Sequence, residues 1–254
     1  MDIRLCDGCN FDKSLEIVKR YEIGLEFQTF RDPTLEDLRI HVEYQKEKTQ
    51  NIKNKSLHAP FWDLNLGSAT PGIQQETMKW FNYAYYIAKE LDCDSLIVHN
   101  GYVPCTSNAS NWVKIALNFW KEFFSDKDDS ITIMLENQLE LDSGIIIQEV
   151  DEFQDKRLKA CLDIGHAHCN SDMSVYDWVK TLNNRIGYVH LHNNHGKYNK
   201  NALNWDEHLG LLNGTIDIKE VLRLIKENCP QAILAIETRA DDSEKSVKYI
   251  KETL

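Results

Sequence analysis

Apolar and polar residues alternate along the chain in two patterns. Short, nearly continuous apolar runs, most of them ending in a polar or ionisable residue, are each followed by a longer segment whose apolar residues lie three or four positions apart. The first pattern is typical of parallel strands covered on both faces, and the second of amphipathic helices. Eight such runs end near Leu5, Phe27, His58, His99, Glu136, Asp163, His190 and Glu237.

The segments between these runs predict helices. A capping residue before proline at Asp32-Pro33 indicates where one of them begins, and Cys229-Pro230 indicates where another ends. Aromatic side chains at helical spacing in two of the segments are expected to pack between helices and strands. The predicted helices cover residues 14–21, 74–91, 112–124 and 216–228, the segment from Asp32 onward, and the tail after Asp241.

Eight strand–helix units in 254 residues predict an α/β fold in which residues 1–254 form a single domain, a (β/α)8 TIM barrel. An open, doubly wound sheet is the main alternative. No GxGxxG motif follows the first run, which counts against the dinucleotide-binding form of that alternative. We therefore expect no nucleotide cofactor.

Composition narrows the range of partners. With 29 Lys and Arg against 40 Asp and Glu, the formal net charge is −11, which disfavours nucleic acid and anionic membranes as partners. No apolar run approaches the roughly 20 residues that span a bilayer, and the first residues lack the apolar core of a signal peptide. Seven cysteines, an odd number, indicate free thiols and hence a cytoplasmic protein. We interpret the Cys6-x-x-Cys9 spacing as a coincidence, since no second CxxC follows it.

Ionisable residues occupy the ends of the predicted strands. In a TIM barrel these ends meet at one mouth, where active sites lie. Six of the eight runs end in a side chain that can bind a metal, and three more such side chains follow in loops on the same side. His, Asp and Glu supply nitrogen and oxygen ligands to zinc, manganese and related ions. The nine residues are His58, His99, Glu136, Asp163, His166, His190, Asp206, His208 and Glu237.

Each of these residues alone has a simpler explanation. A single histidine at a strand end commonly packs with its polar atoms hydrogen bonded, and a buried carboxylate can pair with Arg or Lys instead of a metal. Six such strand ends at one mouth are better explained together, by a metal site. Phe61 and Trp62, just after His58, either form an apolar wall of the mouth or belong to the core, and His192 either touches substrate or packs.

Several strings of the sequence resemble one family of TIM barrels. They run from about residue 20 to about residue 240 and read GLEFQTF, SLHAPFWDLN, LIVHNGY, IMLEN, LDIGHAH, YVHLHNN, WDEHLGLLNGTID and LAIE. In their order and spacing they resemble the xylose-isomerase-like TIM-barrel superfamily. That superfamily contains endonuclease IV and many sugar and sugar-phosphate isomerases and epimerases.

The resemblance implies a set of metal ligands. In the isomerases and epimerases one divalent ion is bound, and the matching residues here are Glu136, Asp163, His190 and Glu237. Endonuclease IV binds three zinc ions, which implies two further sites. The residues matching those sites are His58 and His99 with Glu136 as a bridge, and His166, Asp206 and His208. We expect zinc or manganese, with magnesium and cobalt as alternatives.

The sequence departs from endonuclease IV in ways that favour the isomerase branch. Leu212 stands where the endonuclease motif usually has glycine, and the following Ile216-Asp217 looks more like the sugar isomerases. No loop is rich in Arg and Lys, as a grip on a bent duplex would require.

We therefore expect a divalent-metal-dependent isomerase or epimerase of a small polyhydroxy carbonyl compound, with or without phosphate. Glu136 and Glu237 would transfer the proton alpha to a metal-polarised carbonyl, and His166 would orient the substrate. The alternatives are a zinc-dependent phosphoesterase, acting on abasic DNA or a small phosphoester, and a barrel that binds a sugar without catalysis. A homodimer is an open expectation, since dimers are common among such barrels. The remaining residues expected to contact substrate are Phe61, Trp62, His192, Lys197 and Arg239.

Overall fold

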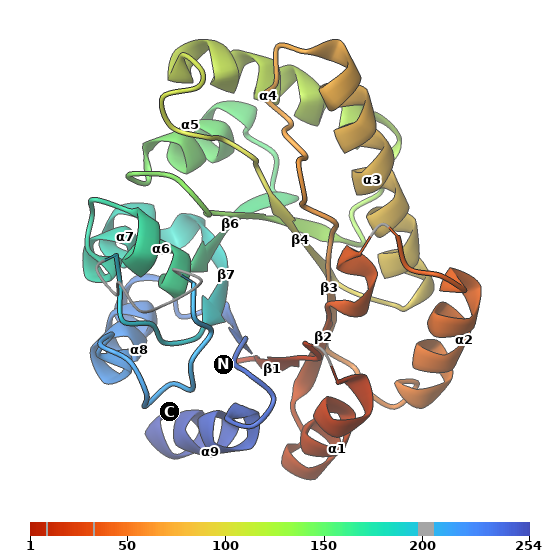
Figure 1. Ribbon diagram of the computed structural model, residues 1–254, viewed down its shortest axis with the longest axis vertical. Helices are drawn as coiled ribbons and strands as arrows, with labels where there is room; N and C mark the ends of the chain where they lie inside the picture. The colour runs from red at the N-terminus through yellow and green to blue at the C-terminus, as the bar shows by residue number, and fades with distance from the viewer. Residues whose placement is uncertain (9, 33, 198–205) are drawn as a thin grey trace.

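The eight predicted strands form a closed parallel barrel surrounded by helices, which confirms the TIM-barrel prediction (Figure 1). The structure, a computed structural model, describes residues 1–8, 10–32, 34–197 and 206–254. Each strand pairs with the next along the chain, and the last pairs with the first. The strands are β1 (Ile3–Cys6), β2 (Gly24–Phe27), β3 (Lys55–His58), β4 (Ser95–His99), β5 (Thr132–Glu136), β6 (Leu158–Asp163), β7 (Ile186–Leu191) and β8 (Ile233–Ile236).

Most of the predicted helices lie within a few residues of their expected places. Helix α8, for example, begins after an Asp217 cap whose side chain accepts from the backbone N–H of Glu220, and it ends before Cys229. The α-helices are α1 (Phe11–Tyr21), α2 (Leu38–Lys48), α3 (Pro71–Glu90), α4 (Ala109–Phe123), α5 (Gly144–Phe153), α6 (Ile164–Asn170), α7 (Val175–Leu182), α8 (Ile218–Asn228) and α9 (Ser243–Thr253). None of the helices in the described ranges is both long and apolar enough to cross a membrane.

The helix predicted to begin at Asp32-Pro33 begins instead at Leu38. The reason lies in the side chain of Asp32, whose Oδ1 accepts from the backbone N–H of Thr34 at 2.8 Å and from its hydroxyl at 2.7 Å. The carboxylate therefore closes a local turn and is not available to cap a helix. Pro33 itself lies outside the described residues.

The alternation of side chains along the strands explains why the mouth of the barrel is ionisable. The barrel interior holds a small apolar cluster, separate from the main core between strands and helices. Its buried members are Cys6, Ile97, Met134, Cys161, Tyr188 and Ala235. Moving two residues along a strand gives a side chain that points into the same interior, one layer closer to the carboxyl end. From β5 to β8 that residue is Glu136, Asp163, His190 and Glu237.

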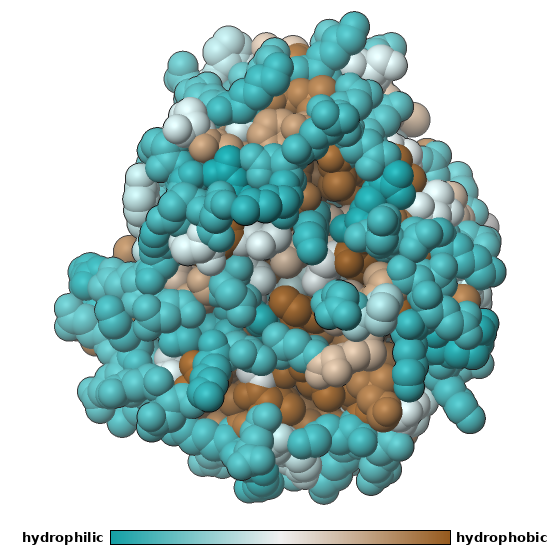
Figure 2. All heavy atoms as spheres, turned by 180° about the vertical axis from the view of Figure 1, so that it is seen from behind, coloured by the Kyte–Doolittle hydropathy of each residue, from teal (hydrophilic) through white to brown (hydrophobic). Residues whose placement is uncertain are grey.

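The opposite end of the barrel is closed by an ion pair. Arg4 is 1% exposed, and its two terminal nitrogens each lie 2.8 Å from a carboxylate oxygen of Asp94. A cavity of about 750 Å³ beside this end is lined by residues at the starts of strands, Ile3 and Gly24 among them. The face seen from behind is mostly hydrophilic, and the largest group of apolar residues on it lies in its lower part (Figure 2). In a TIM barrel this end serves stability, so the functional site is expected at the other.

A carboxyl group on α5 is buried between the helices, and it makes the stability of the fold depend on pH. Glu149 is fully buried, its Oε2 accepts from Nε1 of Trp120 at 2.9 Å, and burial raises its pKa to about 8. The unfolded chain releases this proton at about pH 4.3. The proton thus favours the folded state at low pH, and that contribution is lost as the pH rises toward about 8.

We expect Glu149→Gln to remove this loss, since the amide keeps the acceptor for Trp120 and carries no titratable proton. Relative to the wild type, the variant should gain on the order of 2–4 kcal/mol in free energy of unfolding between about pH 5 and about pH 9. Urea unfolding at both pH values measures the gain. An equal difference between the two proteins at both values would contradict it.

Candidate metal centre

Four buried side chains from consecutive strands converge at the carboxyl end of the barrel. Glu136, Asp163 and His190 lie on β5, β6 and β7, and Glu237 directly follows β8. Each offers one nitrogen or oxygen atom that lies within 4.8 Å of the atoms of the other three. The strand register places Asp163 beside His190 and Glu136 beside His99. We call these four residues the central group.

The imidazole of His190 has acidic neighbours at both nitrogens. Its Nδ1 lies 3.1 Å from Oε1 of Glu136, 3.3 Å from Oε2 of Glu237 and 3.7 Å from Oδ2 of Asp163. Its Nε2 lies 3.0 Å and 3.2 Å from the two carboxylate oxygens of Glu26. Three carboxylates around Nδ1 bring more negative charge than one proton balances, which suits a divalent cation.

A second group shares Glu136 with the central group. The Nε2 atoms of His58 and His99 both lie 3.1 Å from Oε2 of Glu136. Nδ1 of His58 faces the carbonyl oxygen of Ala59 at 2.8 Å, so Nε2 is the nitrogen that faces Glu136. Together with His99, these residues offer ligand atoms that a second ion could bind.

A third group lies in the loops that follow β6, β7 and β8. Asp206 approaches Nε2 of His208 at 2.7 Å, Nε2 of His166 at 3.2 Å and Nδ1 of His192 at 3.7 Å. The ligand atoms that cluster most closely are those of His192, Asp206 and His208. The structure thus adds His192 to the residues expected for this group, while His166 stays in contact with Asp206.

Packing holds His192 in this place. Its Nε2 donates to Asp163 at 3.0 Å, and its ring stacks on His208 with centroids 4.1 Å apart. A Cβ atom on Gly165 would lie 1.9 Å from the ring, so only glycine fits the LDIGHAH string at this point. The nine residues predicted from the sequence are therefore brought together, with His192 among them.

Two residues of the site were missed in the sequence. Glu26 on β2 is fully buried, and Gln28 is 2% exposed. The side-chain amide of Gln28 donates to Oε1 of Glu237 at 2.6 Å and to Oε1 of Glu26 at 3.0 Å. The signal was present in the string GLEFQTF, where a charged residue interrupts an apolar strand at an inward-facing position.

The charges of the site outweigh the effect of burial on its pKa values. Burial alone would raise the pKa of Glu136, but the positive charge of His190 holds it well below its usual range. Burial would also lower the pKa of His190, but the carboxylates of Glu26 and Glu237 raise it well above its usual range. A metal ion binding here must displace protons from such histidines.

The aromatic residues predicted beside the mouth lie next to the second group. The ring of Phe61 stacks on His99 with centroids 4.6 Å apart, and Trp62 meets Phe61 edge-on. Trp62 is 53% exposed, so its indole is available to a ligand. Lys197 pairs with Asp172 at 2.5 Å, and Arg239 is exposed. Neither of these two cations therefore belongs to the ligand groups of the described residues.

The donor set fits a divalent metal ion. Four buried atoms of the site have no hydrogen-bond partner among the described residues: Nδ1 of His99, Nδ1 of His192, Oδ1 of Asp206 and Oε2 of Glu237. Buried polar atoms are normally satisfied, and nitrogen and carboxylate oxygen atoms are ligands that zinc and manganese accept.

The chain is a TIM barrel whose ionisable side chains gather at the carboxyl ends of its strands. The chain belongs to the xylose isomerase-like TIM barrel family, whose model matches residues 15–254. It is 32% identical over 211 residues to "Uncharacterized protein MJ1311" of Methanocaldococcus jannaschii, which covers 78% of this chain and 69% of that protein.

Solved structures share the fold over the whole chain. A D-tagatose 3-epimerase-like protein matches with a TM-score of 0.80 and 24% identity, over 100% of this chain and 97% of that one. The IolI protein with a bound zinc atom matches with a TM-score of 0.78 and 15% identity, over 100% and 96%.

Proposed function

We propose that the chain is a divalent-metal-dependent isomerase or epimerase of a small polyhydroxy carbonyl compound such as a ketose. The observation that carries the proposal is the central group, which places two buried glutamates beside one histidine nitrogen at the mouth of the barrel. Membership of the family supports it. The name of the D-tagatose 3-epimerase-like protein fits an epimerase, and the zinc atom bound to the IolI protein fits a metal site.

The central group would hold the ion, through Glu136, Asp163, His190 and Glu237. A divalent ion in that place supplies Lewis-acid polarisation of a carbonyl and a neighbouring hydroxyl, which makes the hydrogen alpha to the carbonyl acidic. Zinc and manganese are the ions that we favour, since the donors are one nitrogen and three carboxylates.

Glu237 and Glu136 are the two groups that we assign to proton transfer. Oε1 of Glu237 is fixed by the amide of Gln28 at 2.6 Å, while its Oε2 is buried without a hydrogen-bond partner among the described residues. We assign that oxygen, 3.3 Å from Nδ1 of His190, to taking a proton from the substrate carbon. Glu136 comes from a different strand, so it can return a proton from another direction.

Other side chains would orient the substrate. Nδ1 of His166 donates to the carbonyl oxygen of Asn137 at 2.8 Å, which leaves Nε2 facing the mouth beside Asp206. We assign His166 to the substrate oxygen where negative charge develops. Phe61 and Trp62 would cover the carbon chain of the sugar. His192, behind His166, would shape the pocket.

A phosphate group, should the substrate carry one, would need a cation near the mouth. Lys197 follows β7 and Arg239 follows β8. We propose these two side chains as its contacts.

Exchange of a substrate hydrogen with solvent tests the proposal. Protein loaded with zinc or manganese is incubated in deuterated water with a panel of ketoses, inososes and their phosphates, and deuterium is located by NMR. We expect incorporation at the carbon next to the carbonyl of at least one compound, since the abstracted proton mixes with solvent. Protein stripped of metal is the control. No exchange with any compound at full metal occupancy would refute an isomerase or epimerase.

Phosphoester hydrolysis is the second candidate, because the second and third groups add further histidines to the site. If two or three zinc ions occupy the groups, a hydrolase of the endonuclease IV type becomes the better assignment. The formal net charge of −11 favours a small phosphoester over DNA. Elemental analysis of the zinc content and a chromogenic phosphodiester distinguish this candidate from the first.

A further inference from the structure

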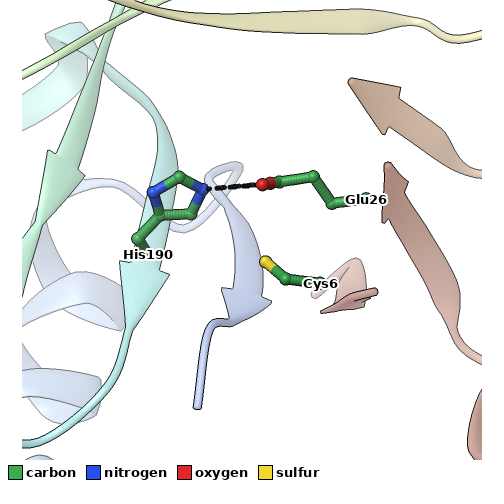
Figure 3. A group of neighbouring side chains, drawn as sticks. All are labelled: Cys6, Glu26 and His190. Carbon is green, nitrogen blue, oxygen red and sulfur yellow. Dashed lines mark hydrogen bonds and ion pairs between the residues drawn. The ribbon is translucent and has the colours of Figure 1, made fainter. Parts of the chain in front are cut away.

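The residue behind the proposed metal ligand His190 is itself an acid. Glu26 reaches from β2 across the barrel interior toward Nε2 of His190, and the thiol of Cys6 lies beside both (Figure 3). The two contacts from Nε2 to the carboxylate measure 3.0 Å and 3.2 Å. Glu26 and His190 are both fully buried, so each depends on the other for a partner.

Glu26 is held in place by further donors. The hydroxyl of Tyr188 donates to its Oε2 at 2.7 Å and also meets the hydroxyl of Ser56 at 2.7 Å, while the amide of Gln28 donates to its Oε1 at 3.0 Å. Each carboxylate oxygen thus has a donor besides His190.

The two sides of the His190 ring therefore differ. On the Nε2 side every carboxylate oxygen is satisfied by donors of the chain. On the Nδ1 side Oε2 of Glu237 has no hydrogen-bond partner among the described residues. A proton on Nε2 satisfies the first side, and a divalent ion bound at Nδ1 would satisfy the carboxylates on the second.

Cys6 is the third ligand-type side chain beside Glu26 and His190. A metal ion among these three residues would have to replace hydrogen bonds that Glu26 accepts. The donors from Tyr188, Gln28 and His190 already occupy the oxygens of Glu26. Cys9, the other member of the CxxC spacing, lies outside the described residues.

We propose that Glu26 is a positioning residue that accepts the Nε2 proton of His190, fixes the ring with Nδ1 as the ligand atom, and strengthens the binding of a divalent ion to Nδ1. The inference rests on the metal centre of the proposed function. Carboxylates that hold a ligating histidine in this way act through its tautomer, its orientation and its basicity.

The test compares metal affinities of the full-length chain. Glu26→Gln keeps the shape of the side chain and removes its charge. Zinc is titrated stepwise in competition with a chromophoric chelator, and we expect the dissociation constant to rise by about 10-fold or more. Two matched controls are Glu149→Gln, a buried glutamate on α5 that lies outside the ligand groups, and Cys6→Ser. Both should stay within about twofold of the wild type.

A second measurement needs no variant. In zinc-loaded wild-type protein labelled with 15N-histidine, NMR should find the proton of His190 on Nε2, shifted downfield by the carboxylate, and the metal on Nδ1. A proton on Nδ1 would overturn the inference even if Glu26→Gln did not fold. Thermal melting of the metal-free variants separates a loss of affinity from a loss of fold.

The outcomes separate this inference from the proposed function. If the wild type binds zinc and Glu26→Gln binds it equally well, Glu26 is no positioning residue and the metal centre stands. If Cys6→Ser weakens binding as much as Glu26→Gln, the ion lies among Cys6, Glu26 and His190, and the hydrogen-bond assignment is wrong. If the wild type binds no ion, both fail. If Glu26→Gln weakens zinc binding but the wild type exchanges no hydrogen of any ketose, Glu26 is a positioning residue and the proposed isomerase or epimerase activity is wrong.

Discussion

Glu237→Gln and Glu136→Gln are each expected to slow proton exchange by a factor on the order of 10²–10⁴, the usual contribution of a general base. The amide keeps the size of the side chain and can still accept from Gln28, which donates to Oε1 of Glu237 at 2.6 Å. It cannot take a proton from carbon. The loss should therefore appear in the rate at saturating substrate. The deuterium-exchange assay at saturating metal measures it.

The two variants should differ in which epimer they affect. If one glutamate serves each face of the substrate carbon, each variant loses exchange with one epimer and retains it with the other. Metal content must be measured for every sample, since both residues belong to the central group. Glu149→Gln is the matched control and should exchange at the wild-type rate. Full activity of both variants with metal bound would remove the glutamates from the mechanism.

The barrel could be predicted because its signal is repeated. Eight apolar runs alternating with amphipathic segments leave few folds open for a chain of 254 residues. The same regularity predicted that six ionisable residues share one mouth, since a residue at the carboxyl end of a barrel strand faces the mouth. Their division into ligand groups came from the resemblance to the family. The structure brings one such group together. The Nε2 atoms of His58 and His99 each lie 3.1 Å from Oε2 of Glu136.

Glu26 and Gln28 escaped prediction because only the end of each run was considered. Glu26 lies one residue before the end of β2 and Gln28 one residue after it, and alternation turns both into the interior. His192 could not be assigned to a group, since its partners Asp206 and His208 come from a loop 14 and 16 residues further on. Such contacts depend on the path of the loop, which periodicity does not encode.

The start of α2 shows a different limit. Asp32-Pro33 satisfies the usual rule for a helix start, yet the helix begins at Leu38. The carboxylate of Asp32 has two competing uses, to cap a helix or to close a turn on Thr34, and here it closes the turn. Both uses satisfy the same backbone donors locally, so only the surrounding packing decides between them.

Removal of the metal is expected to abolish exchange while the barrel stays folded. The core between strands and helices does not depend on the ion, so metal-free protein should still unfold cooperatively. At a free-ion concentration about 100 times the dissociation constant, binding should add about 2.7 kcal/mol of stability. For a chain of this size that corresponds to roughly 5–10 °C in the melting temperature. Calorimetry before and after a chelator measures the shift.

The increase in melting temperature on metal binding should grow with pH, because protons and the metal ion compete for the same side chains. Burial would lower the pKa of His190, but the carboxylates of Glu26 and Glu237 raise it well above its usual range. The unfolded pKa is near about 6.5. The proton on this histidine therefore stabilises the metal-free protein fully below about pH 6.5, and that contribution is lost as the pH rises through the raised pKa of the folded protein. A metal-induced shift that is larger at pH 6 than at pH 9 would contradict this exchange of protons for metal.

Stoichiometry decides which groups the ion uses. One ion per chain, lost in His190→Ala and kept in His208→Ala, is the result we expect, because the central group combines three carboxylates with the single histidine that Glu26 holds. When the ion is added back to metal-free protein, the melting temperature and the exchange rate should both be fully restored at one equivalent. If activity returns only at two or three equivalents of zinc, and His208→Ala abolishes it, the second and third groups are in use. A hydrolase would then be the better assignment, and hydrolysis of a chromogenic phosphodiester tests it.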